Sequence, residues 1–320
     1  MLIKNADSRD RDLATLRSLL DHPAASADIK ARVEQEIKKM QAGIKGEQDA
    51  AYEINFYFGP SKNWAVIHDL RVEHAGRVAQ IDHLLINRFL ECWVFESKHF
   101  SEGIAINEQG ECTIFWNGKP RGIPSPYEQN VKHIAVLKAM GDSGAIPLPT
   151  RLGISIKPTY IGMVAVSKGA RISRPKENGW WSTSVIKADQ IRAAIDKAID
   201  ADNNILGAVK LVASDTLQVF ARGFAARHRP ILVDWHAKFG LSKVQPASPI
   251  IEVLPTVLKV EEPPAPKAEE QPSAKKSKLI CKACEVSVTY NVAKFCWNNN
   301  RRFGGDIYCM NCQKTAPQPG

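Results

Sequence analysis

The sequence predicts a mixed α/β fold followed by a small metal-binding module. Apolar residues recur at helical spacing up to about residue 58, and runs rich in Ile, Val, Leu, Phe and Trp then alternate with further helical stretches. Five of the seven cysteines lie in the last forty residues. In a reducing compartment, this clustering is typical of metal binding rather than of disulfide bonds. We therefore expect a larger α/β unit and a smaller cysteine-rich unit.

The composition of the 320-residue chain is that of a folded protein. Hydrophobic residues make up 44% and charged residues 24%, which excludes a wholly disordered chain, a collagen-like fibre and a disulfide miniprotein. No apolar stretch approaches the roughly 18–20 residues of a membrane span, and the charged N-terminus lacks the apolar run of a signal peptide. We therefore expect a cytoplasmic protein with reduced thiols and no membrane partner. The net charge of +9 favours an anionic partner, nucleic acid first.

The first 58 residues are expected to form two helices. Leucines at helical spacing predict the first helix, and His22-Pro23 ends it. Ser26 or Asp28 is a suitable cap for a second helix that runs to about Phe58. Gly43 and Gly46 are the points at which that helix could be interrupted. We find no functional signal before Gly46.

A run of strands follows these helices. Residues 64–70, 78–87 and 90–99 are rich in strand-forming residues, and the short Asn87-Arg88 connection predicts a hairpin between the last two. Further expected elements are a strand at 112–116, a helix from Pro126 to about Met140, a strand at 160–167, and helices at 185–201 and 206–227. Residues 242–278 contain seven prolines and no aromatic residue, a composition typical of a linker.

Two C-x-x-C pairs after the linker predict a zinc site. Cys281 and Cys284 are separated by 24 residues from Cys309 and Cys312. Each pair presents two thiolates to one ion, and the two pairs complete a tetrahedral Zn²⁺ site. A module this small cannot bury enough apolar surface to fold unless a metal ion or another cross-link stabilises it, so the metal would be structural. The alternative is a redox pair or incidental cysteines; Cys296 is left over and is expected to pack beside Trp297.

The same module concentrates positive charge. Residues 271–320 contain eight basic and two acidic residues, whereas the first 270 residues account for only +3 of the net charge. Aromatic residues are interleaved with these cations, as in the small zinc ribbons at the ends of topoisomerases. Aromatic faces next to cations suit single-stranded nucleic acid. The alternatives are an aromatic core with a solvated basic face, or a ribbon that docks protein.

Asp82, Glu96 and Lys98 are the strongest candidates for a catalytic site. Glu96 and Lys98 project to the same side of their strand, and hairpin pairing brings Asp82 near them. Two carboxylates beside a lysine suit a divalent metal and phosphodiester hydrolysis. The spacing alone is weak evidence, but charges within apolar strands are unfavourable unless they serve a site. We expect Asp69 and Glu73 to be ordinary acids at a loop edge, and His83, His99 and His133 to be packed or supporting residues.

A series of motifs between residues 46 and 144 carries a family resemblance. In order they are Gly46-Glu47 opening a helix, Val66-Ile67-His68-Asp69-Leu70, Gln80-Ile81-Asp82-His83, Val94-Phe95-Glu96-Ser97-Lys98 with a later Trp116, and Pro126-Tyr127-Glu128-Gln129-Asn130 before His133. This stretch of about 100 of the 320 residues resembles the nuclease-related domain, NERD, a divergent branch of the PD-(D/E)xK nucleases. The resemblance implies a restriction-endonuclease-like, four-stranded mixed sheet flanked by helices, Mg²⁺ (or Mn²⁺) dependence and DNA processing or repair.

The resemblance also implies roles for individual residues. Asp82 and Glu96 would be metal ligands, with the carbonyl of Ser97 as a further ligand, and Lys98 would be the catalytic lysine. Glu47 would be an auxiliary acid, or alternatively a helix-dipole partner. Gln129 would approach the scissile phosphate or water, or alternatively be a surface amide. The family usually has Thr or a similar residue between the Glu and the Lys, so Ser97 is a mild departure. Ile81 stands where the superfamily has proline, a form that the family itself shows.

Three functions follow as hypotheses. The first is a metal-dependent nuclease that acts on DNA, possibly single-stranded or branched, and grips it with the zinc ribbon. The second is a non-catalytic nucleic-acid-binding protein on a degenerate nuclease scaffold. The third is an adaptor that recruits a helicase or another DNA-processing protein. The expected organisation is an N-terminal helical segment at 1–45, a nuclease-like domain with a helical extension at 46–241, a linker at 242–278 and a zinc ribbon at 279–315.

Overall fold

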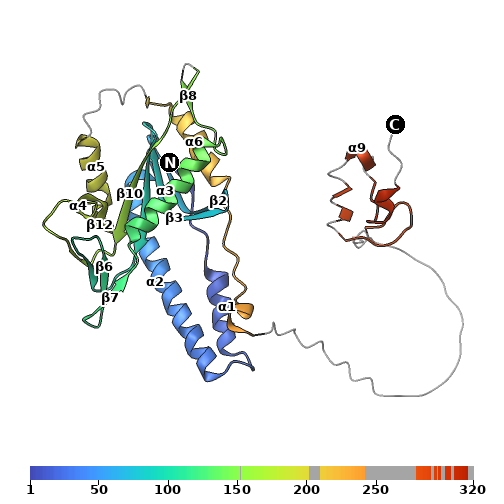
Figure 1. Cartoon of the computed structure of the whole chain (residues 1–320), viewed down its shortest axis with the longest axis horizontal. Coiled ribbons are helices and arrows are strands. Elements are labelled where there is room, and N and C mark those ends of the chain that lie inside the picture. The colour runs from blue at the N-terminus through green and yellow to red at the C-terminus, as the bar shows by residue number, and fades with distance from the viewer. Residues whose placement is uncertain are drawn as a thin grey trace, which may run out of the picture. The chain divides into compact units, whose positions relative to one another are not determined.

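The computed structural model forms two compact units, Met1–Ser248 and Pro249–Gly320 (Figure 1). The structure describes residues 1–151, 153–201, 210–241, 279–289, 292–293, 295–296, 300–303 and 306–315. The predicted linker at 242–278 lies outside the described residues. In the described part of the chain, no helix combines the length and the apolar character needed to cross a membrane.

The larger unit is built on a six-stranded mixed sheet with the order β1-β2-β3-β4-β10-β12. Strands β2, β3 and β4 pair antiparallel, whereas β1, β10 and β12 join by parallel pairing. The predicted mixed α/β class and the hairpin are confirmed. The sheet exceeds the four strands implied by the family resemblance because two three-residue strands extend its edges. The bounds are β1 Leu2–Lys4, β2 Trp64–His74, β3 Arg77–Asn87, β4 Glu91–Lys98, β10 Thr159–Val166 and β12 Val185–Lys187.

A second sheet has four strands in the order β11-β5-β6-β7. Strands β5 to β7 follow β4 along the chain, and β11 follows β10. The edge strand β7 contains Pro120, which lacks a backbone donor and is tolerated at an edge. A two-stranded pair, β8 and β9, completes the strands of the described residues. The bounds are β5 Gly103–Ile106, β6 Cys112–Trp116, β7 Lys119–Ile123, β8 Thr150–Arg151, β9 Ile154–Ser155 and β11 Arg171–Ser173.

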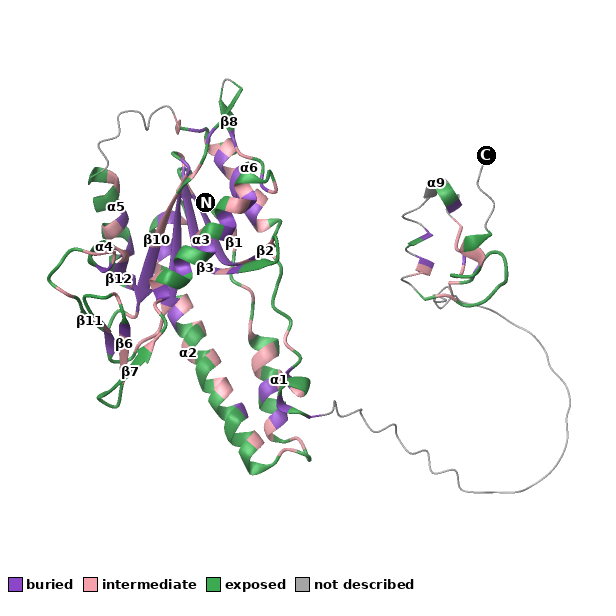
Figure 2. Ribbon diagram, viewed as in Figure 1, coloured by how far each residue is buried: buried purple, intermediate pink, exposed green. Residues whose placement is uncertain are grey.

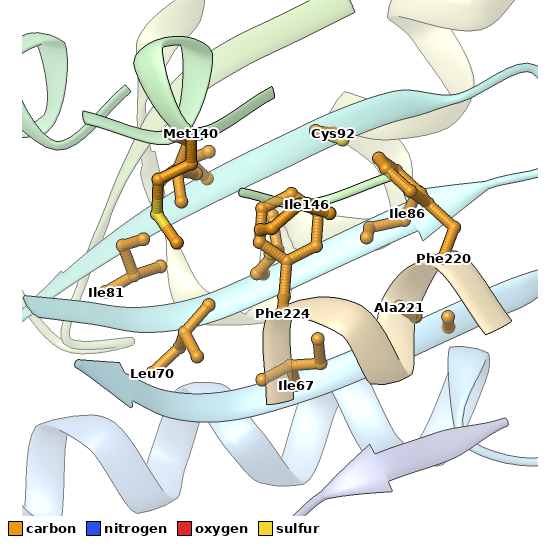
Figure 3. Close-up of a cluster of buried hydrophobic side chains, with 14 of the residues drawn as sticks. Ile67, Leu70, Ile81, Ile86, Cys92, Met140, Ile146, Phe220, Ala221 and Phe224 are labelled. Atoms are coloured by element: carbon orange, nitrogen blue, oxygen red, sulfur yellow. The ribbon is translucent and has the colours of Figure 1, made fainter. Parts of the chain in front are cut away.

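Helices cover both faces of the six-stranded sheet (Figure 2). Helices α3 and α6 bury Met140, Phe220 and Phe224 against Ile67 and Ile81 on one face (Figure 3). Helices α2 and α5 pack against the other face. The helices of this unit are α1 Asp10–Leu20, α2 Ala27–Phe58, α3 Pro126–Asp142, α4 Trp181–Ser184, η1 Ala188–Gln190, α5 Ile191–Ala201, α6 Ser214–Ala225 and α7 Trp235–Phe239.

Several expected elements differ from the observed ones. Helix α2 continues through Gly43 and Gly46, so Gly46-Glu47 lies within a helix and does not open one. The expected boundary between residues 45 and 46 therefore falls inside α2. The predicted helix at 185–201 begins as strand β12, because Val185 and its neighbours pair with β10. The predicted helix at 206–227 is observed as α6, which begins at Ser214; residues 206–209 lie outside the described part.

The smaller unit has little regular structure in its described residues. A bridge joins Ile280 and Ser287, and the backbone N–H of Lys282 donates to the carbonyl of Ile307 at 2.7 Å. These contacts are too short to form named strands. Trp297, which was expected to pack beside Cys296, lies outside the described residues. The short helices are α9 Asn300–Phe303 and η3 Cys312–Lys314.

Candidate active site

An interruption of strand alternation places polar residues beside α2. In β3, Ile81 and Leu84 both join the core under α3 and α6, although they are three residues apart. A regular strand would turn residues i and i+3 to opposite faces. Asp82 and His83 are the two residues between them, and both line a cleft with residues of α2. The local irregularity of the strand thus delivers an acid and a histidine to the same side.

The neighbouring strand β2 contains a matching irregularity. Ile67 and Leu70 join the same core, with His68 and Asp69 between them. Asp69 has a φ of +50°, in the left-handed region, which a non-glycine residue rarely adopts. In the pairing of β2 with β3, His68 pairs with His83 and Leu70 pairs with Ile81. Asp69 and Asp82 occupy the opposing positions between these pairs but do not pair with each other. The two strands are therefore distorted at the same level, next to the predicted catalytic acid.

Strands β3 and β4 separate at the predicted catalytic acids. Their antiparallel pairing ends at His83 and Phe95, and β4 continues to Lys98 paired only with β10 in the described sheet. Asp82 and Glu96 are the first residues beyond this last pair. In the opening between the strands, the Asp82 carboxylate accepts a hydrogen bond from the backbone N–H of Ser97 at 2.7 Å. The fork brings Asp82, Glu96 and Ser97 together.

Glu96 and Lys98 form the ion pair that strand alternation predicts. Lys98 Nζ donates to Glu96 Oε1 at 2.5 Å, and the glutamate is buried while the lysine is partly exposed. The other carboxylate oxygen, Oε2, is buried and has no hydrogen-bond partner among the described residues. Burial raises the pKa of Glu96, and the Lys98 ammonium and the Gln129 amide oppose that rise. One oxygen of Glu96 is therefore left for a further cation.

Asp82 and Glu47 add negative charge to the same place. Burial, Glu96 and Glu47, in that order, raise the pKa of Asp82 well above its ordinary value. Burial and the nearby Asp69 raise the pKa of Glu47, while Arg9 and Lys98 lower it. Carboxylates that raise one another's pKa lack sufficient positive charge nearby. This electrostatic deficit fits a bound divalent cation.

The raised pKa of Asp82 predicts a stability effect. A carboxyl whose folded pKa exceeds its unfolded value costs stability as pH rises above the unfolded value, and the full cost is present above the folded pKa. Asp82→Asn should therefore raise the melting temperature at pH 7.5 without added divalent cations by about 2–4 °C, equivalent to ~1 kcal/mol. The gain should vanish near pH 4. Thermal melting of both proteins across this pH range measures it.

The exposed Asp142, which pairs only with the exposed Lys157 among described residues, is the matched control. Asp142→Asn should leave the melting temperature nearly unchanged, because surface ion pairs contribute little. A lower melting temperature for Asp82→Asn at pH 7.5 would show that Asp82 is not held at an electrostatic cost.

Close packing of α2 against the end of β4 positions Glu47. A Cβ atom added at Gly46 would lie 3.1 Å from Cβ and 3.2 Å from the backbone N of His99. Such contacts are tighter than ordinary van der Waals packing, so glycine permits the approach. Glu47, the next residue, is half-buried and lines the cleft with Asp82. Glycine at position 46 thus explains why an acid of a helix reaches the sheet fork.

A series of hydrogen bonds from Asn55 through His68 and His83 supports the side chain of Ser97. Asn55 Oδ1 accepts from His68 Nε2 at 3.1 Å, and the two histidines contact through their Nδ1 atoms at 2.8 Å. His83 Nε2 then contacts Ser97 Oγ at 2.9 Å. With the Asn55 oxygen as acceptor, His83 donates to His68 and Ser97 donates to His83. This series of hydrogen bonds fixes the position of Ser97, whose backbone N–H donates to the Asp82 carboxylate.

Both His68 and His83 are neutral at physiological pH. Burial, followed by the charge of Lys4, lowers the pKa of His68 to about 4. Burial, followed by His68, lowers the pKa of His83 well below its ordinary value. Protonation would also place two N–H groups against each other. His83 is therefore a packed and supporting residue, as the sequence predicts, and His68 has the same role.

The helix α3 brings two further residues toward Glu96. His133 Nδ1 lies 3.8 Å from Glu96 Oε2, and burial together with Lys98 lowers the pKa of His133 to about 4. Gln129, one turn earlier, is exposed but close enough to lower the pKa of Glu96. Ser125 caps this helix by accepting a hydrogen bond from Glu128 N, and Pro126 occupies its first turn. The helix therefore begins beside the β4 acid.

The predicted residues do not all meet in one cavity. A cleft of about 310 Å³ is lined by Glu47 and Asp82, whereas Glu96, Lys98 and Gln129 are not among its lining residues. Apart from the cysteines, no three His, Asp or Glu ligand atoms of the described residues lie within 4.8 Å of one another. A cation at the fork would therefore be held by Asp82 and Glu96, with the Ser97 carbonyl. Glu47 stands outside that direct set.

Two residues near the cleft, Asp69 and Arg9, were not predicted as site residues. Asp69 is buried in β2, and accepts hydrogen bonds from the backbone N–H of Asp7 at 3.2 Å and from the Gln80 amide, so it is not a loop-edge acid. Arg9 pairs with Asp69 and lines the cleft. The break between Ile67 and Leu70 is a signal that could have identified Asp69. Nothing in the local sequence marks Arg9, because its place depends on a distant contact.

The four cysteines of the smaller unit form a metal-ligand cluster. The sulfur atoms of Cys281, Cys284, Cys309 and Cys312 lie within 4.8 Å of one another. Although burial opposes ionisation, backbone N–H groups of Cys309 and Cys284 lower the pKa of Cys281 to about 6. A four-thiolate set is typical of a structural Zn²⁺ site.

Cys296 does not join this cluster. It is buried with Phe303 and Tyr308, and its sulfur accepts a hydrogen bond from Tyr308 N at 3.3 Å. It is therefore a core residue, while the neighbouring Trp297 lies outside the described residues.

Comparison with known proteins gives one result. Neither the curated proteins nor the solved structures provide a match to this chain. A family model described as the nuclease-related domain, NERD, matches residues 42–160. The match contains Glu47, β2, β3, β4 and the first part of β10, and it excludes Arg9 and the cysteine cluster. The sheet fork with Asp82, Glu96 and Lys98 therefore lies within the stretch, residues 42–160, that is similar to the nuclease-related domain, NERD.

Proposed function

We propose that this protein is a divalent-metal-dependent nuclease that hydrolyses DNA phosphodiester bonds during DNA processing or repair. The observation that carries the proposal is the sheet fork, where Asp82 and Glu96 meet beside Lys98. There Glu96 retains a buried oxygen that has no hydrogen-bond partner among the described residues. The match to a nuclease-related domain over the same residues supports it. Mg²⁺ is the expected cation and Mn²⁺ a substitute, because carboxylate and carbonyl oxygens suit hard cations.

The residues at the fork have distinct tasks. Asp82 and Glu96 would hold the cation, which when bound supplies positive charge to the phosphoryl oxygen and lowers the pKa of a water. Lys98 keeps its ammonium beside Glu96 and is placed to orient that water or to stabilise negative charge on the phosphate. Glu47 lies at the cleft with a raised pKa and is suited to hydrogen bonding with the water. The Asn55–His68–His83 chain holds Ser97 in place.

The cysteine module supports a binding role. Four thiolates suit one structural Zn²⁺, and the segment around them is strongly basic. We propose that the module holds DNA while the sheet fork cleaves it, and that a helicase or similar DNA-processing protein is a further partner. A cytoplasmic location belongs to the same proposal.

A cleavage assay tests the proposed function. The purified full-length chain should cleave single-stranded, double-stranded or branched DNA with Mg²⁺ or Mn²⁺ and should be inactive after chelation. Asp82→Ala should lower the rate at least ~10³-fold, equivalent to about 4 kcal/mol of transition-state stabilisation. Asp142→Ala, an exposed change on α3, should cleave as the wild type does. Metal-independent cleavage, or full activity in Asp82→Ala, would show that the fork is not the catalytic site.

A further inference from the structure

The N-terminal segment forms a wall of the cleft that contains Asp82. Residues Ala6 to Asp10 line this cleft together with four residues of α2 and with Asp82 and His83 of β3; the α2 residues are Ile44, Glu47, Gln48 and Ala51. This segment precedes the part of the chain that matches the nuclease-related domain, which begins at residue 42. A cleft wall is thus supplied by a part of the protein to which neither the sequence nor the family match assigns a task.

Polar contacts hold this wall against the sheet. Lys4 Nζ donates to the carbonyls of His68 and Asp69 at 3.2 and 3.0 Å and to the Asp7 carboxylate at 2.9 Å. The same Asp7 carboxylate contacts His228 Nε2 at 2.8 Å, and the backbone N–H of Asp7 donates to Asp69. The segment is therefore tied to β2 and to the region after α6. Such anchoring keeps a side chain of the segment in place before a ligand arrives.

Arg9 is the cationic residue of this cleft. Among the residues that line the cleft in the described part of the chain, Arg9 is the only one with a full positive charge at neutral pH. Its Nη2 lies 3.3 and 3.5 Å from the two carboxylate oxygens of Asp69. No hydrogen bond within the described residues uses its Nε or Nη1. The guanidinium therefore keeps donors for a further anion.

We propose that Arg9 binds a phosphate of the nucleic-acid substrate, next to the phosphate that reacts at the sheet fork. This inference rests on the proposed function for the class of its ligand. Arg9 lines the cleft together with Glu47 and Asp82, and its charge, like that of Lys98, lowers the pKa of Glu47. An arginine suits the planar recognition of a phosphate diester. Asp69 is a positioning residue, because it contacts the guanidinium from a buried site.

Salt-dependent DNA binding by the full-length chain tests this role. Binding to an oligonucleotide is measured from 50 to 200 mM salt with Ca²⁺ in place of Mg²⁺, so that cleavage does not interfere. Arg9→Gln should weaken binding about tenfold and reduce the slope of log K against log salt by about 0.7–0.9, the value of one phosphate contact. Arg9→Lys should restore most of the slope. Arg17→Gln makes the same charge change on an exposed residue of α1 and should leave both values unchanged.

A loss of packing at Asp69 is separated from a loss of phosphate binding by a double variant. Arg9→Gln with Asp69→Asn removes both charges together, so no buried carboxylate is left unpaired. Its melting temperature should stay near that of the wild type, and its DNA binding should remain as weak as that of Arg9→Gln. Recovery of wild-type binding in the double variant would overturn the proposal.

The remaining outcomes distinguish this inference from the proposed function. A wild-type chain that binds DNA but does not cleave it contradicts the nuclease function alone, and the salt slope still reports on Arg9. A wild-type chain that cleaves DNA, with an unchanged slope and KM in Arg9→Gln, overturns the role of Arg9 alone. A chain that does not bind DNA at all overturns both.

Discussion

Glu96→Gln should abolish both Ca²⁺ binding at the sheet fork and Mg²⁺-dependent cleavage, whereas Lys98→Met should abolish cleavage alone. Glu96 supplies one of the two carboxylates at the fork, and its Oε2 is buried without a hydrogen-bond partner among the described residues. An amide carries no charge to offset desolvation of a cation. Lys98 competes with a cation for Glu96, since its ammonium contacts Oε1 at 2.5 Å. Its removal should therefore leave metal binding intact or slightly tighter.

The size of the expected loss follows from the chemistry. A phosphoryl group that gains negative charge in the transition state depends on nearby positive charge. Each variant should lose at least ~10³-fold in cleavage rate, equivalent to about 4 kcal/mol. Calorimetric titration with Ca²⁺, which prefers oxygen to thiolate ligands, reports on the fork rather than on the cysteines. Single-turnover cleavage of a labelled oligonucleotide reports the rate.

Glu91→Gln is the matched control on the same strand. Glu91 begins β4 and accepts a hydrogen bond from Asn87 at 2.7 Å, away from the fork. This variant should bind Ca²⁺ and cleave DNA as the wild type does. Cleavage by Glu96→Gln, or loss of Ca²⁺ binding in Lys98→Met, would contradict the roles given to these residues.

The sequence predicted the elements whose own residues carry strong periodicity. Strands β2, β3, β4, β6 and β10 lie within a few residues of the expected ranges, and Pro126 begins α3 as predicted. The proximity of Glu96 to Lys98 also follows from alternation within one strand. These features depend on local pattern, and local pattern is present in the sequence.

The missed elements depend on distant partners. Strand β1 has only three residues, and it exists because Leu2 and Lys4 pair with β2 more than sixty residues away. Strand β12 was expected as the start of a helix, because Val185 and Ile186 precede a helical stretch and show no alternation of their own. Strand β7 contains Pro120 and Gly122, which disfavour a strand except at an edge. Tertiary pairing outweighs local preference in each case.

The site was predicted in outline but not in its electrostatics. Asp82, Glu96 and Lys98 come from a recognisable hairpin. Asp69 and Arg9 become neighbours of that hairpin only through the distortion of β2 and the anchoring of the N-terminal segment. The break in alternation at residues 67–70 was visible in the sequence, but its consequence, a buried acid opposite Asp82, required the pairing register.

Removal of zinc should unfold the cysteine module while the larger unit stays folded. Described residues of the module bury a small core, which consists of Cys281, Cys296, Phe303 and Tyr308. Two of these core residues are cysteines, so little apolar area remains to stabilise the fold without metal. The larger unit has its own extensive core on both faces of the sheet. The double variant Cys284→Ser with Cys309→Ser should therefore lose zinc and become protease-sensitive only after residue 278.

Loss of zinc should affect DNA binding and DNA cleavage differently. If the module holds DNA, the double cysteine variant should bind DNA about tenfold more weakly at 150 mM salt, with a smaller salt slope, because unfolding disperses the positive charge of the module. Cleavage at saturating DNA should persist, since Asp82, Glu96 and Lys98 belong to the larger unit. Zinc content, limited proteolysis and DNA binding are the three measurements.

Cys296→Ala is the control that distinguishes a ligand from a core residue. The Cys296 sulfur lies outside the four-cysteine cluster and accepts a hydrogen bond from Tyr308 N. Its replacement should lower the stability of the module by about 1–3 kcal/mol through the lost contacts and the unpaired N–H. One zinc per chain should remain. Zinc loss in Cys296→Ala, or zinc retained in the double variant, would assign the metal to a different set of thiolates. Equal DNA binding by the wild type and the double variant would assign DNA binding to the larger unit, where Arg9 lines the cleft with Asp82 and Lys98 pairs with Glu96.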